Sequence, residues 1–214
     1  MRCPISYADA YMTVGEKEWK LSEAEELAEK YKDGHPCDEG IEDNGFGVVI
    51  FHTDDSKPPT YFYGKVPKQL LQEYAPEGQY IFVLEALAQC LALWVFWPFL
   101  RCPYWSFVDN AAAQWALSKG YSSCPEGNVL TTLFWAVAVR YTCDPWFERV
   151  PSKANCSDAI SRGDLSFAKE HGWVECTIGL EETWKVLREA LSSPTQDRPD
   201  VAGSLCTSAA FAVQ

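Results

Sequence analysis

An apolar run that ends in a single carboxylate constrains this chain more than any other feature. The run is Trp105–Val108, Asp109 follows it, and residues 110–119 have the composition of a helix that ends at Gly120. Glycine suits the left-handed turn that closes many helices, so the pattern predicts a buried strand, a turn and a helix. Ligands and catalytic groups gather at the carboxyl ends of such strands in open α/β sheets. Burying a carboxylate there is costly unless a cation compensates it, which predicts a cation near Asp109.

The composition is typical of a packed globular protein. Of 214 residues, 47% are hydrophobic and 14% aromatic, which is enough for a full core in one domain with extensions. The nine cysteines form no Cys-x-x-Cys pair, which argues against zinc and favours a reducing compartment. Residues 1–9 lack the apolar core of a signal peptide, so we expect an intracellular protein, cytoplasmic or nuclear, that is not secreted.

One segment, Ile81–Leu100, has the hydropathy of a membrane span. It contains Glu85, Gln89 and Pro98, and a spanning helix avoids an unpaired glutamate. We therefore interpret it as a helix of the protein core and expect no membrane partner.

The formal net charge of −12 argues against simple affinity for nucleic acid, because phosphate binding needs basic surface. The charge is unevenly distributed, however. Residues 16–43 contain eleven acidic and four basic residues and so carry more than half of the excess. We interpret this segment as an acidic insertion, a solvated loop and helix that can project away from a binding face.

The order of the expected elements predicts an α/β fold, βββαβαβα. Strands are expected at residues 5–14, 45–52, 60–66, 105–109 and 145–150, the first three as an antiparallel meander. Helices are expected at residues 22–32, 67–74, 81–100, 110–120, 128–140 and 180–191, and from Asp158 with Ser157 as its N-cap. These boundaries predict a domain over residues 1–170, a C-terminal helical extension over 171–192 and a flexible tail over 193–214.

Four acidic residues are anomalous in their own segments. Asp9 interrupts the first strand, where aspartate is disfavoured, Glu85 is the only charge in its apolar helix, and Asp109 closes a buried strand. Asp158 opens a helix, which is weaker evidence because first-turn acids match the helix dipole. Mg²⁺ and Mn²⁺ prefer oxygen ligands, and two such ions about 4 Å apart support phosphodiester hydrolysis. We therefore ask whether these four carboxylates share a site for two Mg²⁺ or Mn²⁺ ions.

Four sequence segments carry a family resemblance. They are YADAY at residues 7–11, IFVLEALA at 81–88, VDNAAAQWALSKGYS at 108–122 and ERVPSKANCSDAISRG at 148–163. Together they resemble the type-I ribonuclease H family, in particular the domain that follows reverse transcriptase in eukaryotic retroelements. The likeness covers about residues 5–165, and its last two segments are the more specific. It implies a five-stranded mixed sheet, three antiparallel strands followed by βαβα, flanked by helices.

The resemblance also implies a reaction, which is cleavage of the RNA strand in an RNA–DNA hybrid to leave a 3′-OH and a 5′-phosphate. Asp9 and Asp109 would hold both ions, Glu85 would bind one ion and position the RNA near its 2′-OH, and Asp158 would complete the second ion's site. The hybrid would be recognised by shape, phosphate and 2′-OH. A reverse transcriptase domain in the same polyprotein is an implied partner. Candidate nucleic-acid contacts, each of which can equally be a cap or a surface residue, are Asn110, Gln114, Lys153, Asn155 and Arg162.

Two alternative functions stay open. A catalytically decayed domain of this fold would serve a structural or interaction role in a retroelement protein, although the complete set of four acids argues against decay. A 3′–5′ exonuclease of the same fold would place an Asp-x-Glu pair in the first strand, and Asp9-Ala-Tyr11 lacks that pair. The tryptophans at 115, 135, 146 and 173 are expected to pack in the core or in an interface rather than to stack on bases.

Overall fold

A six-stranded mixed sheet organises the part of the chain that the computed structural model describes, residues 3–14, 41–74, 80–192 and 211–212. The strand order is β5-β4-β1-β2-β3-β6, with β1–β2 and β2–β3 antiparallel and the other neighbours parallel. The strands are β1 (Ile5–Val14), β2 (Ile41–Phe51), β3 (Thr60–Gly64), β4 (Pro103–Val108), β5 (Asp144–Arg149) and β6 (Val174–Glu175). The predicted α/β class and mixed sheet are confirmed, and β6 adds a sixth strand to the five expected.

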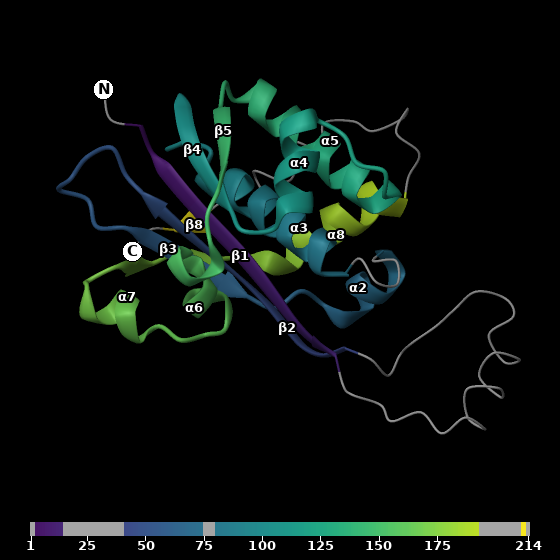
Figure 1. The fold of residues 1–214 in the computed structure, drawn as a ribbon, viewed down its shortest axis with the longest axis horizontal. Helices are drawn as coiled ribbons and strands as arrows, with labels where there is room; N and C mark the ends of the chain where they lie inside the picture. Colours follow the sequence, from purple (N-terminus) through teal and green to yellow (C-terminus); the bar gives the residue numbers. More distant parts are fainter. Residues whose placement is uncertain (1–2, 15–40, 75–79, 193–210, 213–214) are drawn as a thin grey trace, which may run out of the picture.

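Seven α-helices and one 3-10 turn connect and follow these strands in the described residues (Figure 1). They are α2 (Lys68–Tyr74), α3 (Tyr80–Phe96), α4 (Ala111–Lys119), α5 (Pro125–Arg140), η1 (Ser152–Ala154), α6 (Ser157–Ser161), α7 (Ser166–Glu170) and α8 (Leu180–Ser192). Two further short strands, β7 (Thr177–Ile178) and β8 (Phe211–Ala212), pair antiparallel with each other. The helix expected at residues 22–32 and most of the acidic insertion lie outside the described residues, as does the expected tail apart from β8.

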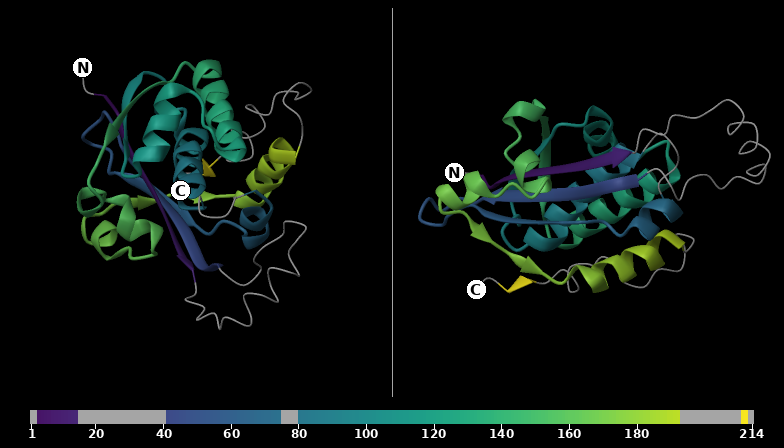
Figure 2. Two further views of the ribbon diagram at one scale, coloured as in Figure 1. Left: turned by 45° about the vertical axis from the view of Figure 1, so that its right-hand side comes forward. Right: turned by 90° about the horizontal axis from the view of Figure 1, so that it is seen from below.

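Alternating side chains of the central strands divide the core into two layers. Ala8 and Val48 belong to the large apolar cluster that also contains α3, α4 and α5. Val49 and Tyr61 point the other way and pack with Ile160 of α6. This period of two places α6 and α7 on the opposite side of the sheet from the long helices, as Figures 1 and 2 show.

Helix α3 is largely apolar because it is enclosed on all sides. Every residue from Phe82 to Phe96 is buried, between the sheet and α5. The expectation of a core helix is confirmed, and no helix in the described part of the chain is long and apolar enough to cross a membrane. The helix ends four residues before the expected Leu100, because Pro98 lacks an amide donor and disfavours helical geometry in the residue before it.

A glycine allows α6 to lie directly against the sheet. A Cβ atom on Gly47 would lie 2.4 Å from the backbone nitrogen of Ser161 and 2.8 Å from the carbonyl oxygen of Ser157. Gly47 is the register partner of Asp9 on β1. The close approach of α6 therefore places the end of this short helix over the first of the four anomalous acids.

Candidate metal centre

The centre lies where two parallel strands separate. β1 and β4 pair only over Ile5–Tyr7 and Trp105–Phe107. Asp9 and Asp109 each lie two residues beyond the last pair, Tyr7 and Phe107, whose rings stack with centroids 4.8 Å apart. The two aspartates are therefore level with each other at the opening of a fork in the sheet.

Glu85 reaches this fork from α3, a helix that packs against the sheet. It lies on α3, is only 3% exposed, and its carboxylate lies close enough to the backbone N–H of Ala10 for that group to lower its pKa. One carboxylate oxygen from each of Asp9, Glu85 and Asp109 lies within 4.8 Å of the others. Across the described ranges, no other group of three His, Cys, Asp or Glu side chains has this geometry.

Burial and mutual repulsion make this cluster unfavourable without a cation. Burial first, and then the charges of Asp9 and Asp109, raise the pKa of Glu85 to about 10. Burial and the charges of Asp109 and Asp158 raise the pKa of Asp9 to about 7, against the lowering effect of the Ser161 hydroxyl. One Glu85 oxygen, Oε2, is buried and meets no hydrogen-bond partner among the described residues. An unsatisfied carboxylate oxygen in an all-oxygen cluster fits a hard divalent ion.

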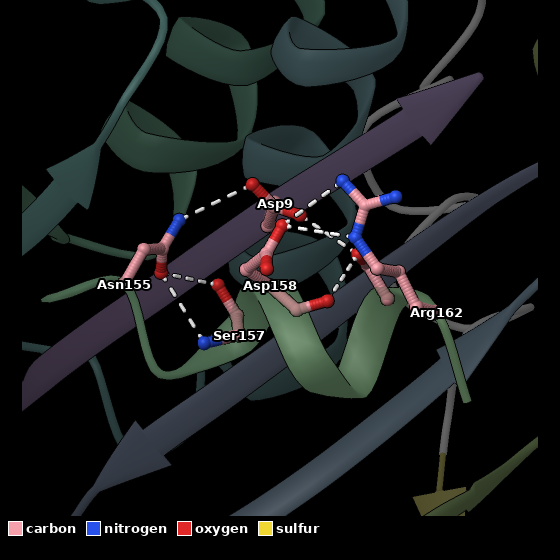
Figure 3. A network of polar contacts seen from close by, with 6 residues as sticks. Asp9, Asn155, Ser157, Asp158 and Arg162 are labelled. Atoms are coloured by element: carbon pink, nitrogen blue, oxygen red, sulfur yellow. Dashed lines mark hydrogen bonds and ion pairs between the residues drawn. The ribbon is translucent and has the colours of Figure 1, made fainter. Parts of the chain in front are cut away.

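Asp158, the fourth predicted ligand, lies beside this group but is not one of the three. Its Oδ1 accepts hydrogen bonds from both Nε and Nη2 of Arg162, each at 3.2 Å (Figure 3). The pair spans one turn of α6, and both side chains are about half exposed. Asp158 is nevertheless close enough for its charge to raise the pKa of Asp9.

Two polar residues fix the orientation of Asp9. Asn155 donates from Nδ2 to Asp9 Oδ1 at 3.3 Å, and Ser161 donates from Oγ to Asp9 Oδ2 at 2.7 Å. The Asn155 Oδ1 atom accepts in turn from the backbone N–H and the hydroxyl of Ser157 (Figure 3). The expectation that Ser157 caps a helix starting at Asp158 is wrong, because α6 begins at Ser157 itself and Cys156 occupies the N-cap position.

Gln89 joins the two strands behind the acids. It lies one helical turn after Glu85, is 1% exposed, and donates from Nε2 to the carbonyl oxygens of Ala8 at 3.4 Å and Phe107 at 3.1 Å. Its Oε1 accepts from the Ser106 hydroxyl at 2.8 Å. A side chain thus bonds to both strands at the fork.

Replacing Gln89 by Leu should lower the free energy of unfolding by about 2–3 kcal/mol. The substitution removes three buried hydrogen bonds, which join Gln89 to the Ser106 hydroxyl and to the carbonyl oxygens of Ala8 and Phe107, and each such bond contributes about 0.5–1.5 kcal/mol. Urea denaturation of Gln89→Leu, Ser106→Ala and the double variant measures this. The double variant should lose less than the sum of the single variants. Strict additivity would show that the two side chains do not interact.

The predicted nucleic-acid contacts occupy different kinds of position. Asn110 caps α4 by accepting from the Ala113 backbone N–H at 3.0 Å, and Gln114 donates to the Phe147 carbonyl oxygen at 3.5 Å. Lys153 is exposed in η1, whereas Asn155 is buried with its amide committed to Asp9 and Ser157. Of these five candidates, Lys153 and Arg162 have exposed side chains.

A pocket extends from Asn110 along α4. It is lined in part by Trp115, Lys119 and Tyr121, and the Lys119 ammonium lies 5.0 Å from the centroid of the Trp115 ring. Trp115 is 62% exposed and Trp146 is 64% exposed, so these two tryptophans do not pack in the core, and their packing in an interface stays a prediction. An exposed aromatic ring beside a lysine offers a stacking surface and a cation in one place.

Sequence reasoning missed two residues of the centre, Gln89 and Ser161. The spacing of Gln89 from Glu85 was a usable signal, because two polar residues four apart in an apolar helix share one face. Ser161 carried no such signal, since its contact with Asp9 joins segments 152 residues apart.

Comparisons with known proteins gave matches among solved structures. Searches with protein-family models and against curated sequences gave no match. The chain is similar to the N-terminal RNase H domain of rv2228c from Mycobacterium tuberculosis, solved as a fusion with maltose-binding protein, with a TM-score of 0.46 and 15% identity over 79% of this chain and 97% of that one. It is also similar to RNase H1 from the halophilic archaeon Halobacterium salinarum NRC-1, with a TM-score of 0.46 and 14% identity over 78% of this chain and all of that one.

Proposed function

We propose that this chain is a ribonuclease H-type endoribonuclease that cleaves the RNA strand of RNA–DNA hybrids and depends on divalent metal ions. The observation that carries the proposal is the convergence of Asp9, Glu85 and Asp109 in a sheet fork, together with the unsatisfied Glu85 Oε2. The donor set contains carboxylates and no sulfur or imidazole, which suits Mg²⁺ or Mn²⁺ and not zinc.

In this proposal the chain's own residues hold and orient the reacting groups. Asp9, Glu85 and Asp109 would hold the first ion, and Asp158 with Asp9 would complete the site of the second. Asn155 and Ser161 keep both oxygens of Asp9 in position. When bound, two such ions supply Lewis-acid stabilisation for in-line displacement at phosphorus. Water attacks the phosphorus atom and the bond to the 3′-oxygen breaks, which leaves a 3′-OH and a 5′-phosphate.

The hybrid would contact both sides of the fork. Lys153 and Arg162 lie on the α6 side of Asp9, and Trp115 with Lys119 lies beyond Asn110 on the α4 side. Exposed cations suit phosphate, and an exposed indole suits a sugar or base face. We include Asn110 and Gln114 as shorter-range contacts next to Asp109.

We further propose that the domain derives from a retroelement polyprotein in which a reverse transcriptase domain is its partner. The segment VDNAAAQWALSKGYS at residues 108–122 supports this origin. The corresponding domain is residues 1–170, with the acidic insertion at 16–43 and an extension over 171–192. We place its action inside the cell, and the seven cysteines in the described residues, all free thiols, support this.

The proposal is tested with purified protein and an end-labelled RNA–DNA hybrid. We expect cleavage of the labelled RNA strand in Mg²⁺ or Mn²⁺ and none in EDTA, with products that carry a 3′-OH. Single-stranded RNA, duplex RNA and duplex DNA of the same sequence are the matched controls and should stay intact.

Each alternative function has its own outcome. Removal of single nucleotides from a 3′ end would identify an exonuclease. No cleavage in either metal, with the metals still bound, would identify a structural domain that has lost catalysis. Either result overturns the endoribonuclease proposal.

A further inference from the structure

We propose that Arg162 competes with the second divalent ion for Asp158, so that the two ions enter the centre in a fixed order. The inference rests on the proposed metal centre. It assigns Arg162 the role of a positioning residue that occupies the second site with its own charge until an ion displaces it.

The first observation is the division of the four acids into three and one. Asp9, Glu85 and Asp109 bring their oxygens within 4.8 Å of one another without the help of Asp158. Asp158 is instead held by a guanidinium, through two hydrogen bonds to one oxygen. Three carboxylates are therefore ready for a first ion, whereas the fourth already has a cation.

The second observation is that Arg162 lies close to Asp9 as well as to its partner Asp158. The residue before it, Ser161, donates a hydrogen bond from Oγ to Asp9 Oδ2 at 2.7 Å, and the Arg162 charge lowers the pKa of Asp9. A divalent ion shared between Asp9 and Asp158 would be close to this guanidinium. Like charges at such a distance repel, so ion and guanidinium should exclude each other from Asp158.

The third observation is that Arg162 has a second contact, with Tyr11, which it can keep after it releases Asp158. Its guanidinium carbon lies 5.1 Å from the centroid of the Tyr11 ring, a cation–π contact. Tyr11 is buried and fixed, since its hydroxyl donates to Asp43 at 2.7 Å and accepts from Lys65 at 3.0 Å. The stacked guanidinium can rotate away from Asp158 and remain beside the centre.

The pair is weak enough to be exchanged. Both side chains of the Asp158–Arg162 pair are about half exposed, and they lie four residues apart, on α6 and at its C-cap. Such pairs contribute little to stability and separate easily in water. A divalent ion that gains both Asp9 and Asp158 as ligands can therefore replace the guanidinium.

The test is a titration of the full chain with Mn²⁺ in the absence of nucleic acid, with free Mn²⁺ measured by electron paramagnetic resonance. We expect two separate binding steps in the unaltered protein. Arg162→Met should tighten the second step about tenfold, the effect of removing a unit charge near a divalent ion, and leave the first within about twofold. Arg162→Lys should keep most of the separation because it keeps the charge.

Two controls define the result. Lys185→Met removes the cation of a more exposed helical ion pair, Lys185–Glu182 on α8, and should leave both steps unchanged. In Asp158→Asn the second step should be lost, and adding Arg162→Met should not restore it. The inference is overturned if Arg162→Met leaves the second step unchanged, tightens both steps equally, or acts without Asp158.

The titration also separates this inference from the proposed function. An unchanged Mn²⁺ isotherm in Arg162→Met, in a protein that cleaves hybrids, would overturn the ordered exchange alone. Ordered binding in a protein that cleaves no hybrid would overturn the function alone.

Discussion

Asp109→Asn should lower the rate of hybrid cleavage by at least about 10³-fold while leaving the fold unchanged. The substitution keeps the shape of the side chain and removes the charge that a divalent ion needs. It leaves the neighbouring cap intact, because Asn110 continues to accept from the Ala113 backbone N–H. Single-turnover cleavage in Mg²⁺ measures the loss, and circular dichroism and thermal unfolding check the fold.

A matched control for this variant is Asp144→Asn. Asp144 is an exposed aspartate at the first position of β5, at the opposite end of the parallel strands from Asp109. The Asp144→Asn variant has the same change in charge as Asp109→Asn and should cleave the hybrid at a rate within about twofold of the unaltered protein. A full rate in Asp109→Asn, or an equal loss in both variants, would refute the assignment of Asp109 to the centre.

Glu85→Gln should abolish cleavage and at the same time stabilise the metal-free protein at pH 8. The pKa of Glu85 is raised from 4.5 to about 10 in the folded metal-free protein, so the folded chain holds it as the neutral acid. Between pH 4.5 and about pH 10, Glu85 is therefore ionised in the unfolded chain but neutral in the folded chain. Stability from this group is therefore complete below about pH 4.5 and is lost as the pH rises toward 10. Glutamine is neutral at every pH, so the variant does not lose this stability as the pH rises.

The expected gain for Glu85→Gln is roughly 2–4 kcal/mol at pH 8, and it should shrink toward zero near pH 4.5. Urea denaturation in EDTA at a series of pH values measures it. Mn²⁺ should then stabilise the unaltered protein more than the variant, because the variant lacks a ligand. Glu182→Gln, on the exposed face of α8, is the control and should show no such pH dependence. A variant that is less stable in EDTA at pH 8 would contradict this account.

The features that can be predicted from the sequence are those that depend only on residues close together in the chain. The turn after α4 is one example, since Gly120 has φ 78° and its backbone N–H bonds to Ala116 and Leu117 as its position predicts. Helix α3 is another, because twenty largely apolar residues with a single acid fit a core helix better than a membrane span. Asp109 was visible because an acid after an apolar run is anomalous within its own segment.

The remaining features depend on contacts between distant segments. Nothing near Gly47 in the sequence shows that α6 would lie against its backbone. β6 is only two residues long and is identified by its pairing with Thr60 and Tyr61 rather than by its composition. Each of the four acids is anomalous within its own segment, whereas their meeting around metal ions is what the family resemblance implies. The separation of Asp158 from the other three is a property of the folded chain.

The separation of β1 from β4 has a further consequence for how the centre can be observed. Past the last strand pair, the backbone N–H of Ala10 lies near the Glu85 carboxylate, a side chain of α3, and lowers its pKa. A main-chain proton in a strand therefore lies beside one acid group of the centre. Its resonance and its exchange with solvent form a native reporter, which senses whether that carboxylate is protonated, ionised or bound to a cation.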